Sequence, residues 1–183
     1  AEDYVTRAGA LQAARAGLTL SADFIVGFPG ETEEDFEQTL DLVRRVGFVA
    51  AFAFKYSPRP YTPALKLGDE VAEEVKDERL ARLFSVVETQ QQAHLRSLVG
   101  RELQVLIEGP SPGDTGRFAG RSERNEIVHL VAPEGCDPTG ELVTVTIDEP
   151  FRHSLSGYMR GAEHRDVGGR RTRLSVLDAG GSV

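Results

Sequence analysis

The chain has 183 residues, 40% of them hydrophobic, which is enough apolar material for one ordinary domain or two small ones. Its 21 basic and 29 acidic side chains give a formal net charge of −8, which argues against a protein that coats nucleic acid by bulk attraction, although local basic patches remain possible. The apolar runs are too short for a membrane span, and the single Cys136 excludes an internal disulfide and, by itself, a zinc site or an iron-sulfur cluster, so we expect a globular cytoplasmic protein.

The first part of the chain alternates helix, strand, helix and strand. Apolar residues at three- to four-residue spacing predict a helix that stops at Gly17. The run LTLSADFIVGF becomes continuously apolar, which is typical of a strand covered on both faces in a parallel sheet. Thr32 and Asp35 form a capping-box pair that begins a second helix, Gly47 ends it, and FVAAFAFKYS is the second strand. This order predicts right-handed parallel βα units of an α/β fold.

The corner between the first strand and the second helix contains Gly27, Phe28, Pro29 and Gly30. Backbone N–H groups at such a corner can face an anion or a polar ligand. The alternative, which chemistry alone favours, is a tight turn that needs glycine for backbone freedom and proline for rigidity. The corner matches neither the P-loop nor the dinucleotide-binding fingerprint.

A proline-rich segment, SPRPYTPAL, follows the second strand, and its three prolines within six residues predict an extended loop. It leaves the C-terminal end of a strand, where α/β enzymes keep their sites. Donors for a substrate or an RNA are available there from Lys55, Tyr56, Ser57 and Arg59. Solvated loop residues would have the same composition, so the residues leave both interpretations open.

A long helix is predicted from about residue 72 to residue 98, ending at Gly100. Short alternating strands follow, separated by Gly, Pro, Ser and Asp, and predict a small antiparallel β-barrel. These strands are ELQVLIEG, GRFAGRS, NEIVHLVA and ELVTVTIDEP. The tail beyond them is rich in Gly and Arg and is expected to be flexible.

Arginines gather in the barrel segment. Candidates for RNA binding are Arg117, Arg121, Arg124, Asn125 and Arg152. Arginine donors beside an aromatic ring suit a phosphate backbone and unpaired bases. A solvated β-hairpin is the alternative, and charge alone favours it because Glu123 and Glu126 dilute the patch. The four histidines show no metal-ligand spacing, and the sequence contains no signature of a serine or cysteine nucleophile.

Several of these runs, taken together and in this order, resemble the radical-SAM methylthiotransferases, most closely the tRNA-modifying MiaB type. They are DFIVGFPGETEEDFEQTLDLVRRVGF, AFAFKYSPRPYTPA, VLIEG, GRSERNEIVHL, GELVTVTI and SLSGY. The resemblance implies the C-terminal βα units of a TIM-like radical-SAM barrel over residues 1–71 and a connector helix over 72–99. It further implies a TRAM RNA-binding domain, an OB-like barrel, over 100–160 and a flexible tail over 161–183.

The resemblance also implies a reaction, cofactors and a partner. The family uses S-adenosyl-L-methionine and two [4Fe-4S] clusters to place a methylthio group on the isopentenylated adenosine beside the tRNA anticodon. Gly27, Phe28, Pro29 and Gly30 would shape the wall of the S-adenosylmethionine pocket, and the tRNA anticodon stem-loop would be the partner. The family's cluster-binding cysteines lie upstream of the matching runs. We therefore expect a fragment, inactive alone, with no catalytic residue and no metal ligand of its own, and expect a monomer.

Two alternatives stay open. The ribosomal-protein branch of the family shares the GFPGET turn, although FKYSPRP and RSERN favour the tRNA branch. A stand-alone RNA-binding protein that kept the fold and lost the chemistry is the second alternative. One departure from the family is Tyr61, where glycine commonly precedes TPA, and this departure bears on the conformation of the proline-rich loop.

Overall fold

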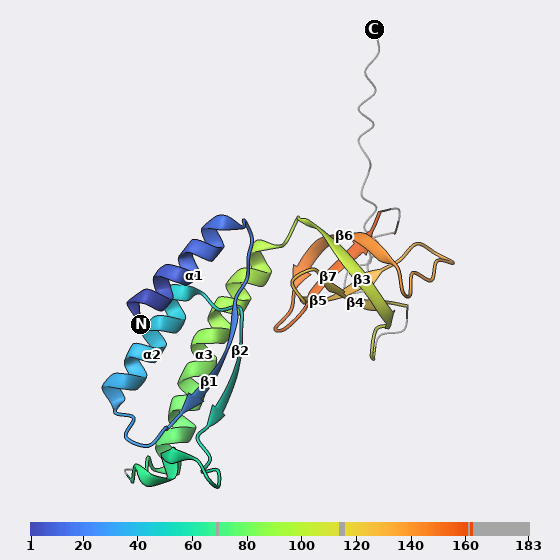
Figure 1. Ribbon diagram of the computed structural model, residues 1–183. Helices are drawn as coiled ribbons and strands as arrows, with labels where there is room; N and C mark the ends of the chain where they lie inside the picture. The colour runs from blue at the N-terminus through green and yellow to red at the C-terminus, as the bar shows by residue number, and fades with distance from the viewer. Residues whose placement is uncertain (69, 114–115, 161, 163–183) are drawn as a thin grey trace. The chain divides into compact units, whose positions relative to one another are not determined.

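The computed structural model describes residues 1–68, 70–113, 116–160 and 162 (Figure 1). The chain divides into two compact units, Ala1–His94 and Leu95–Val183. The predicted flexible tail lies outside the described residues, apart from Ala162. None of the helices in the described ranges has both the length and the apolar character needed to cross a membrane.

The first unit contains a parallel βα arrangement, as predicted. Its elements are α1 (Glu2–Ala14), β1 (Ser21–Val26), α2 (Glu33–Val46), β2 (Ala50–Lys55), the 3-10 helix η1 (Pro63–Lys66) and most of α3 (Glu73–Ser97). β1 and β2 pair in parallel, with Ser21 opposite Ala50 and Val26 opposite Lys55. The C-terminal ends of both strands therefore lie side by side.

Helix α2 begins and ends where its sequence predicts. The Asp35 N–H donates to Thr32 Oγ1 and the Thr32 N–H donates to Asp35 Oδ2, which completes the capping box. Gly47 ends the helix with φ of 73°. The face of α2 that points inward is fully buried, and its residues are Phe36, Leu40, Val43 and Val46.

Only one face of the two-stranded sheet is covered by described residues. Val26 and Ala53 belong to a core that α2, α3 and Ala8 of α1 complete. On the other face Ile25, Phe52 and Phe54 are 59%, 65% and 60% exposed. The prediction of strands covered on both faces is therefore wrong for the described residues, because no described element packs on that second face.

The proline-rich segment is folded rather than extended. The Thr62 N–H donates to the Arg59 carbonyl oxygen over 3.3 Å, which closes a turn, and Pro63 begins η1. The prediction of an extended loop is wrong here, because proline at the second position of a turn and at the first position of a helix has its preferred φ.

The second unit is a closed five-stranded barrel, which confirms the predicted small barrel after βα units. Its strands are β3 (Glu102–Pro110), β4 (Phe118–Ser122), β5 (Ile127–Val131), β6 (Leu142–Pro150) and β7 (Leu155–Met159), and they close in the order β3-β4-β5-β7-β6. All neighbouring pairs are antiparallel except β5 and β7. The pair of β5 with β7 is parallel because β7 runs antiparallel to β6 and inserts beside β5.

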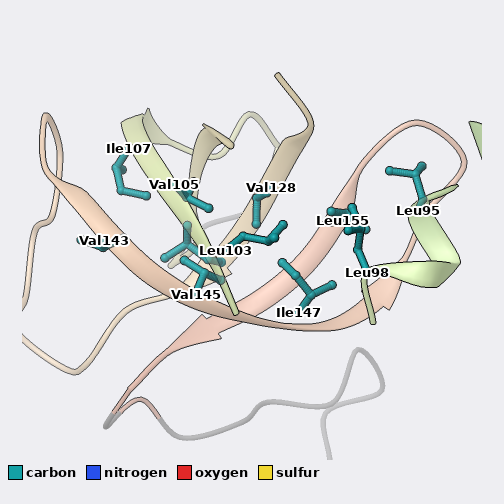
Figure 2. Packing of buried hydrophobic residues seen from close by; sticks show 11 residues of the cluster. Leu95, Leu98, Leu103, Val105, Ile107, Val128, Val143, Val145, Ile147 and Leu155 are labelled. Carbon is teal, nitrogen blue, oxygen red and sulfur yellow. The ribbon is translucent and has the colours of Figure 1, made fainter. Parts of the chain in front are cut away.

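Alternating residues of the strands fill the barrel, and Figure 2 shows these side chains converging on one interior. Val105, Val128 and Leu155 have 0% exposed area. Leu95, from the last turn of α3, and Leu98 close one end of this core. The outward-facing side chains of β3 to β7 do not contribute to this core and are available for contacts outside the barrel.

Candidate functional site

A pocket of about 570 Å³ opens at the C-terminal ends of β1 and β2. It is lined by Ile25, Phe28, Phe54, Lys55, Tyr56, Ser57, Arg59, Thr62, Pro63 and Ala64. Its volume and its mixture of apolar walls with a few polar groups are those of a small-molecule site. Phe28 from the corner thus lies beside the four predicted donors of the second strand and its loop. Parallel strands explain this convergence, because their C-terminal ends meet at one edge.

Tyr56 is the central polar residue of the pocket wall. Its ring meets Phe28 edge-on, with centroids 5.2 Å apart, and the Lys76 Nζ lies 6.0 Å from the ring centroid. Its hydroxyl is buried and has no hydrogen-bond partner among the described residues. A smaller cavity of about 270 Å³, lined also by Pro29 and Pro58, shares the same side chain. A buried hydroxyl without a partner is costly, so this oxygen is placed to bond a ligand or a water molecule.

The backbone N–H groups of the corner are used by the protein itself. The Gly27 N–H donates to Glu31 Oε2 over 2.7 Å, and the Glu31 N–H donates to the Phe28 carbonyl oxygen over 2.8 Å. Gly30 occupies the third position of this Pro-Gly turn with φ of 83°, which is the conformation that a type II turn requires. These contacts support the tight-turn explanation, in which the corner presents the Phe28 side chain to the pocket.

A buried ion pair holds the corner against α3. Arg79 Nη1 lies 2.7 Å from Glu31 Oε2 and donates to the Glu31 carbonyl oxygen over 3.1 Å. The Arg79 and Glu31 side chains are only 5% and 12% exposed. Glu31 therefore joins the Gly27 backbone to α3 and acts as a positioning residue for the pocket wall.

Gly27 is also fixed by its contact with Lys76. Its φ is +71°, and a Cβ built there would overlap Cγ of Lys76 and lie 3.0 Å from Cδ. Lys76 is 6% exposed, and its ammonium lies 2.8 Å from Glu73. Sequence reasoning missed Glu31, Lys76 and Arg79. The available signal was the three- to four-residue spacing of positions 76, 79, 83 and 87, which puts two cations on the buried face of α3.

The two cations of the pocket differ in their surroundings. Lys55 Nζ lies 2.8 Å from Asp77 and 3.1 Å from Glu73. Hydrogen bonds to these carboxylates, that to Asp77 first, raise the pKa of Lys55, so it stays protonated and its charge is offset. Arg59 is exposed on the loop and makes no ion pair with another described residue. Arg59 is therefore the pocket residue better suited to attract a phosphate.

On the barrel, the structure brings Arg121, Arg124 and Asn125 together at the β4–β5 hairpin. The Asn125 N–H donates to the Ser122 carbonyl oxygen, and Asn125 has φ of 68°, a conformation that asparagine tolerates. Arg121 donates to Asn125 Oδ1 over 3.0 Å and lies 3.3 Å from Glu108, while Arg124 lies 3.1 Å from Glu123. The positive φ required by this turn thus explains why position 125 is an asparagine. Each of the two arginines lies beside an acidic side chain.

The other two predicted arginines lie on different loops of the barrel. Arg117 directly precedes β4 and donates to Ser156 Oγ of β7 over 3.3 Å, and Arg152 lies in the β6–β7 loop. In OB-like barrels the second and third strands, and the loops before the second and after the fourth, bind oligonucleotides. Those elements here are β4, β5 and the loops that hold Arg117 and Arg152. Sequence reasoning missed one contact on this surface, between Ser111 Oγ and His129 Nδ1 at 2.8 Å.

Within the described ranges, no group of three or more His, Cys, Asp or Glu side chains is arranged to hold a metal ion. Cys136, the one cysteine of the sequence, is exposed.

Comparisons with known proteins give one consistent name. The chain is 51% identical over 166 residues to a protein of Sorangium cellulosum, covering 87% of this chain and 33% of that protein. It is 46% identical over 158 residues to one of Bordetella avium (86% and 33%) and 44% identical over 156 residues to one of Chromohalobacter salexigens (85% and 35%). All three are named tRNA-2-methylthio-N(6)-dimethylallyladenosine synthase.

The chain spans about a third of the length of these curated relatives and matches their C-terminal part. The matched stretches exceed the 94 residues of the first unit, so the similarity includes both units. No family model matches the chain.

Proposed function

This chain belongs to the family of tRNA-modifying methylthiotransferases, and we propose that its pocket and its barrel serve the transfer of a methylthio group to an N6-dimethylallyladenosine of tRNA. The observation that supports the proposal is identity of 44% to 51% that extends over both units. The three relatives carry names of the tRNA branch, which favours tRNA over a ribosomal protein as the substrate. A tRNA substrate would place the protein in the cytoplasm.

The pocket fits part of an S-adenosylmethionine molecule. Ile25, Phe28 and Phe54 offer apolar walls for its nucleoside. The Tyr56 hydroxyl, which has no partner among the described residues, offers a polar contact to the ligand. In this arrangement Phe28 and Pro29 line the cavities while Gly27 and Gly30 hold the turn that aims them. When bound, S-adenosylmethionine supplies the methyl group and the radical of the family reaction. The described residues do not fit an iron-sulfur cluster, which needs several thiolates.

The remaining predicted residues divide between the two units. Lys55, Ser57 and Arg59 would orient the substrate at the pocket mouth, with Arg59 facing a phosphate. In the barrel Arg117, Arg121, Arg124, Asn125 and Arg152 would contact the RNA backbone near the anticodon. Phosphate contacts of this kind position an RNA and carry no sequence information directly.

RNA binding by the full chain tests the barrel assignment. We expect an anticodon stem-loop RNA to bind, and the double variant Arg121→Ala, Arg124→Ala to bind more weakly, with a salt slope shallower by roughly 1.4. Arg7→Ala is the matched control, because Arg7 on α1 is 78% exposed and pairs with an acid as the barrel arginines do. Fluorescence anisotropy over a range of salt concentrations measures both quantities. An unchanged affinity and slope in the double variant would exclude these two arginines as the contact.

A further inference from the structure

Tyr61 has a backbone conformation that its residue type disfavours. Its φ is +66°, and among the described residues the only other non-glycine with positive φ is Asn125. In this left-handed region the Cβ atom crowds a backbone carbonyl oxygen. Asparagine tolerates that conformation, whereas a bulky aromatic residue there is an outlier. The position of Tyr61 therefore calls for a physical reason.

The turn that holds Tyr61 is built like the corner that holds Gly30. In the segment Arg59-Pro60-Tyr61-Thr62, the Thr62 N–H and hydroxyl donate to the Arg59 carbonyl oxygen over 3.3 Å and 2.8 Å. Proline occupies the second position and the residue with positive φ the third, as in Phe28-Pro29-Gly30-Glu31. Such turns take glycine or asparagine at the third position, so glycine would fit here without strain.

The fold itself gains no contact from the tyrosine side chain. Its relative exposed area is 102%, and it makes no hydrogen bond or ring contact with another described residue. Neither packing nor hydrogen bonding compensates for the strained backbone. Strained backbone conformations cluster at active sites and ligand clamps, so the conformation of Tyr61 points to a binding role for its ring.

The surroundings of Tyr61 define the partner's chemistry. Arg59, Thr62 and Pro63, which flank Tyr61 in sequence, line the pocket, so the exposed ring projects from the loop that borders the pocket. This proline-rich loop therefore carries an exposed aromatic ring and, two residues before it, an exposed guanidinium. Aromatic faces stack on unpaired nucleobases of any sequence, and arginine attracts the phosphates between them.

We propose that Tyr61 stacks on an unpaired nucleobase of the RNA whose modified residue lies at the mouth of the pocket. The inference rests on the proposed function, because it takes RNA as the substrate. It adds an RNA contact on the first unit that is separate from the barrel arginines. It also accounts for a tyrosine at a position where the family commonly has glycine.

The test uses the full chain and an RNA hairpin whose loop contains unpaired adenines. Tyr61→Gly removes the ring and relaxes the turn, so we expect a thermal stability equal to or above that of the parent. We expect its RNA affinity to fall roughly 5- to 150-fold, the effect of losing one stacked base. Tyr61→Phe keeps the aromatic face and should retain the affinity.

A spectroscopic measurement separates stacking from a structural effect. The chain has four tyrosines and no tryptophan, so tyrosine emission can be observed directly. Stacking on a base should quench Tyr61, and Tyr61→Phe should remove that part of the quenching while RNA still binds. Tyr4→Phe is the matched control, because Tyr4 is 49% exposed on α1, and it should leave the RNA-induced quenching in place.

The outcomes distinguish this inference from the proposed function. If the parent chain binds the hairpin and Tyr61→Gly binds equally tightly, the stacking inference is wrong and the proposed function stands. If Tyr61→Phe loses as much affinity as Tyr61→Gly, the hydroxyl rather than the ring makes the contact, and the inference is also wrong. If the parent chain does not bind the hairpin at all, both the proposed function and the inference fail.

Discussion

Replacing Gly27 by alanine adds one methyl group at the most constrained point of the corner. The left-handed backbone, with φ of +71°, costs an alanine about 1–2 kcal/mol. The new Cβ also overlaps Cγ of Lys76 and lies 3.0 Å and 3.2 Å from Cδ and Cε, and Lys76 is only 6% exposed. Forcing this stem aside adds about 1–3 kcal/mol of overpacking, and loss of its contact with the Tyr56 ring adds about 0.5 kcal/mol.

Gly30→Ala separates the two contributions. Gly30 has φ of +83°, but no atom lies within 4 Å of a Cβ built there, so only the backbone cost of about 1–2 kcal/mol applies. We therefore expect Gly27→Ala to lower the free energy of unfolding by about 1.5–3.5 kcal/mol more than Gly30→Ala. Urea denaturation followed by circular dichroism measures this, because α1, α2 and most of α3 belong to the first unit. Equal costs for the two variants would refute the argument that Lys76 packs against Gly27.

Two other predictions concern the same unit. Arg79→Leu leaves the carboxylate of Glu31 buried without its cation, so the free energy of unfolding should fall by about 3–5 kcal/mol in the same denaturation experiment; a loss below about 1 kcal/mol would show that the pair is dispensable. Hydrogen bonds from Thr32 lower the pKa of Asp35, so the folded chain binds fewer protons than the unfolded chain just below pH 4. Stability from this group is complete above the ordinary pKa and is lost as pH falls through the lowered one. Asp35→Asn should accordingly flatten the acid limb of the stability–pH curve, and an unchanged limb would contradict the assignment.

Features set by neighbouring residues were predictable from the sequence, and those set by distant ones were not. The capping box of α2 was predicted because Thr32 and Asp35 are three residues apart and recognise each other's backbone. The pair of Glu31 with Arg79 joins residues 48 positions apart, and helical spacing, which puts Arg79 on the buried face of α3, does not identify its acidic partner. Local sequence patterns specify the helices and strands, whereas the distant partner of a charged side chain depends on how those helices and strands pack.

The candidate site shows the same division. The convergence of Phe28 with Tyr56 followed from two parallel strands, because such strands end at one edge. Asn125 was expected as an RNA ligand, and its positive φ adds a structural reason for an asparagine in the hairpin turn. Tyr61 stood out in the sequence only as a departure from a family pattern, and its positive φ gives that departure a physical meaning.

The insertion of β7 between β5 and β6 has a consequence for biosynthesis. Among the barrel strands, β3 to β6 are synthesised before β7. Until Met159 has been made, β5 and β6 each lack the neighbouring strand that closes the barrel. Unpaired strand edges of nascent chains recruit other strands, including those of neighbouring polypeptides. The first unit, whose core is complete once Val87 of α3 has been made, can fold before the strands of the barrel are synthesised. Premature termination between residues 150 and 155 would therefore release a folded first unit attached to an open, aggregation-prone sheet.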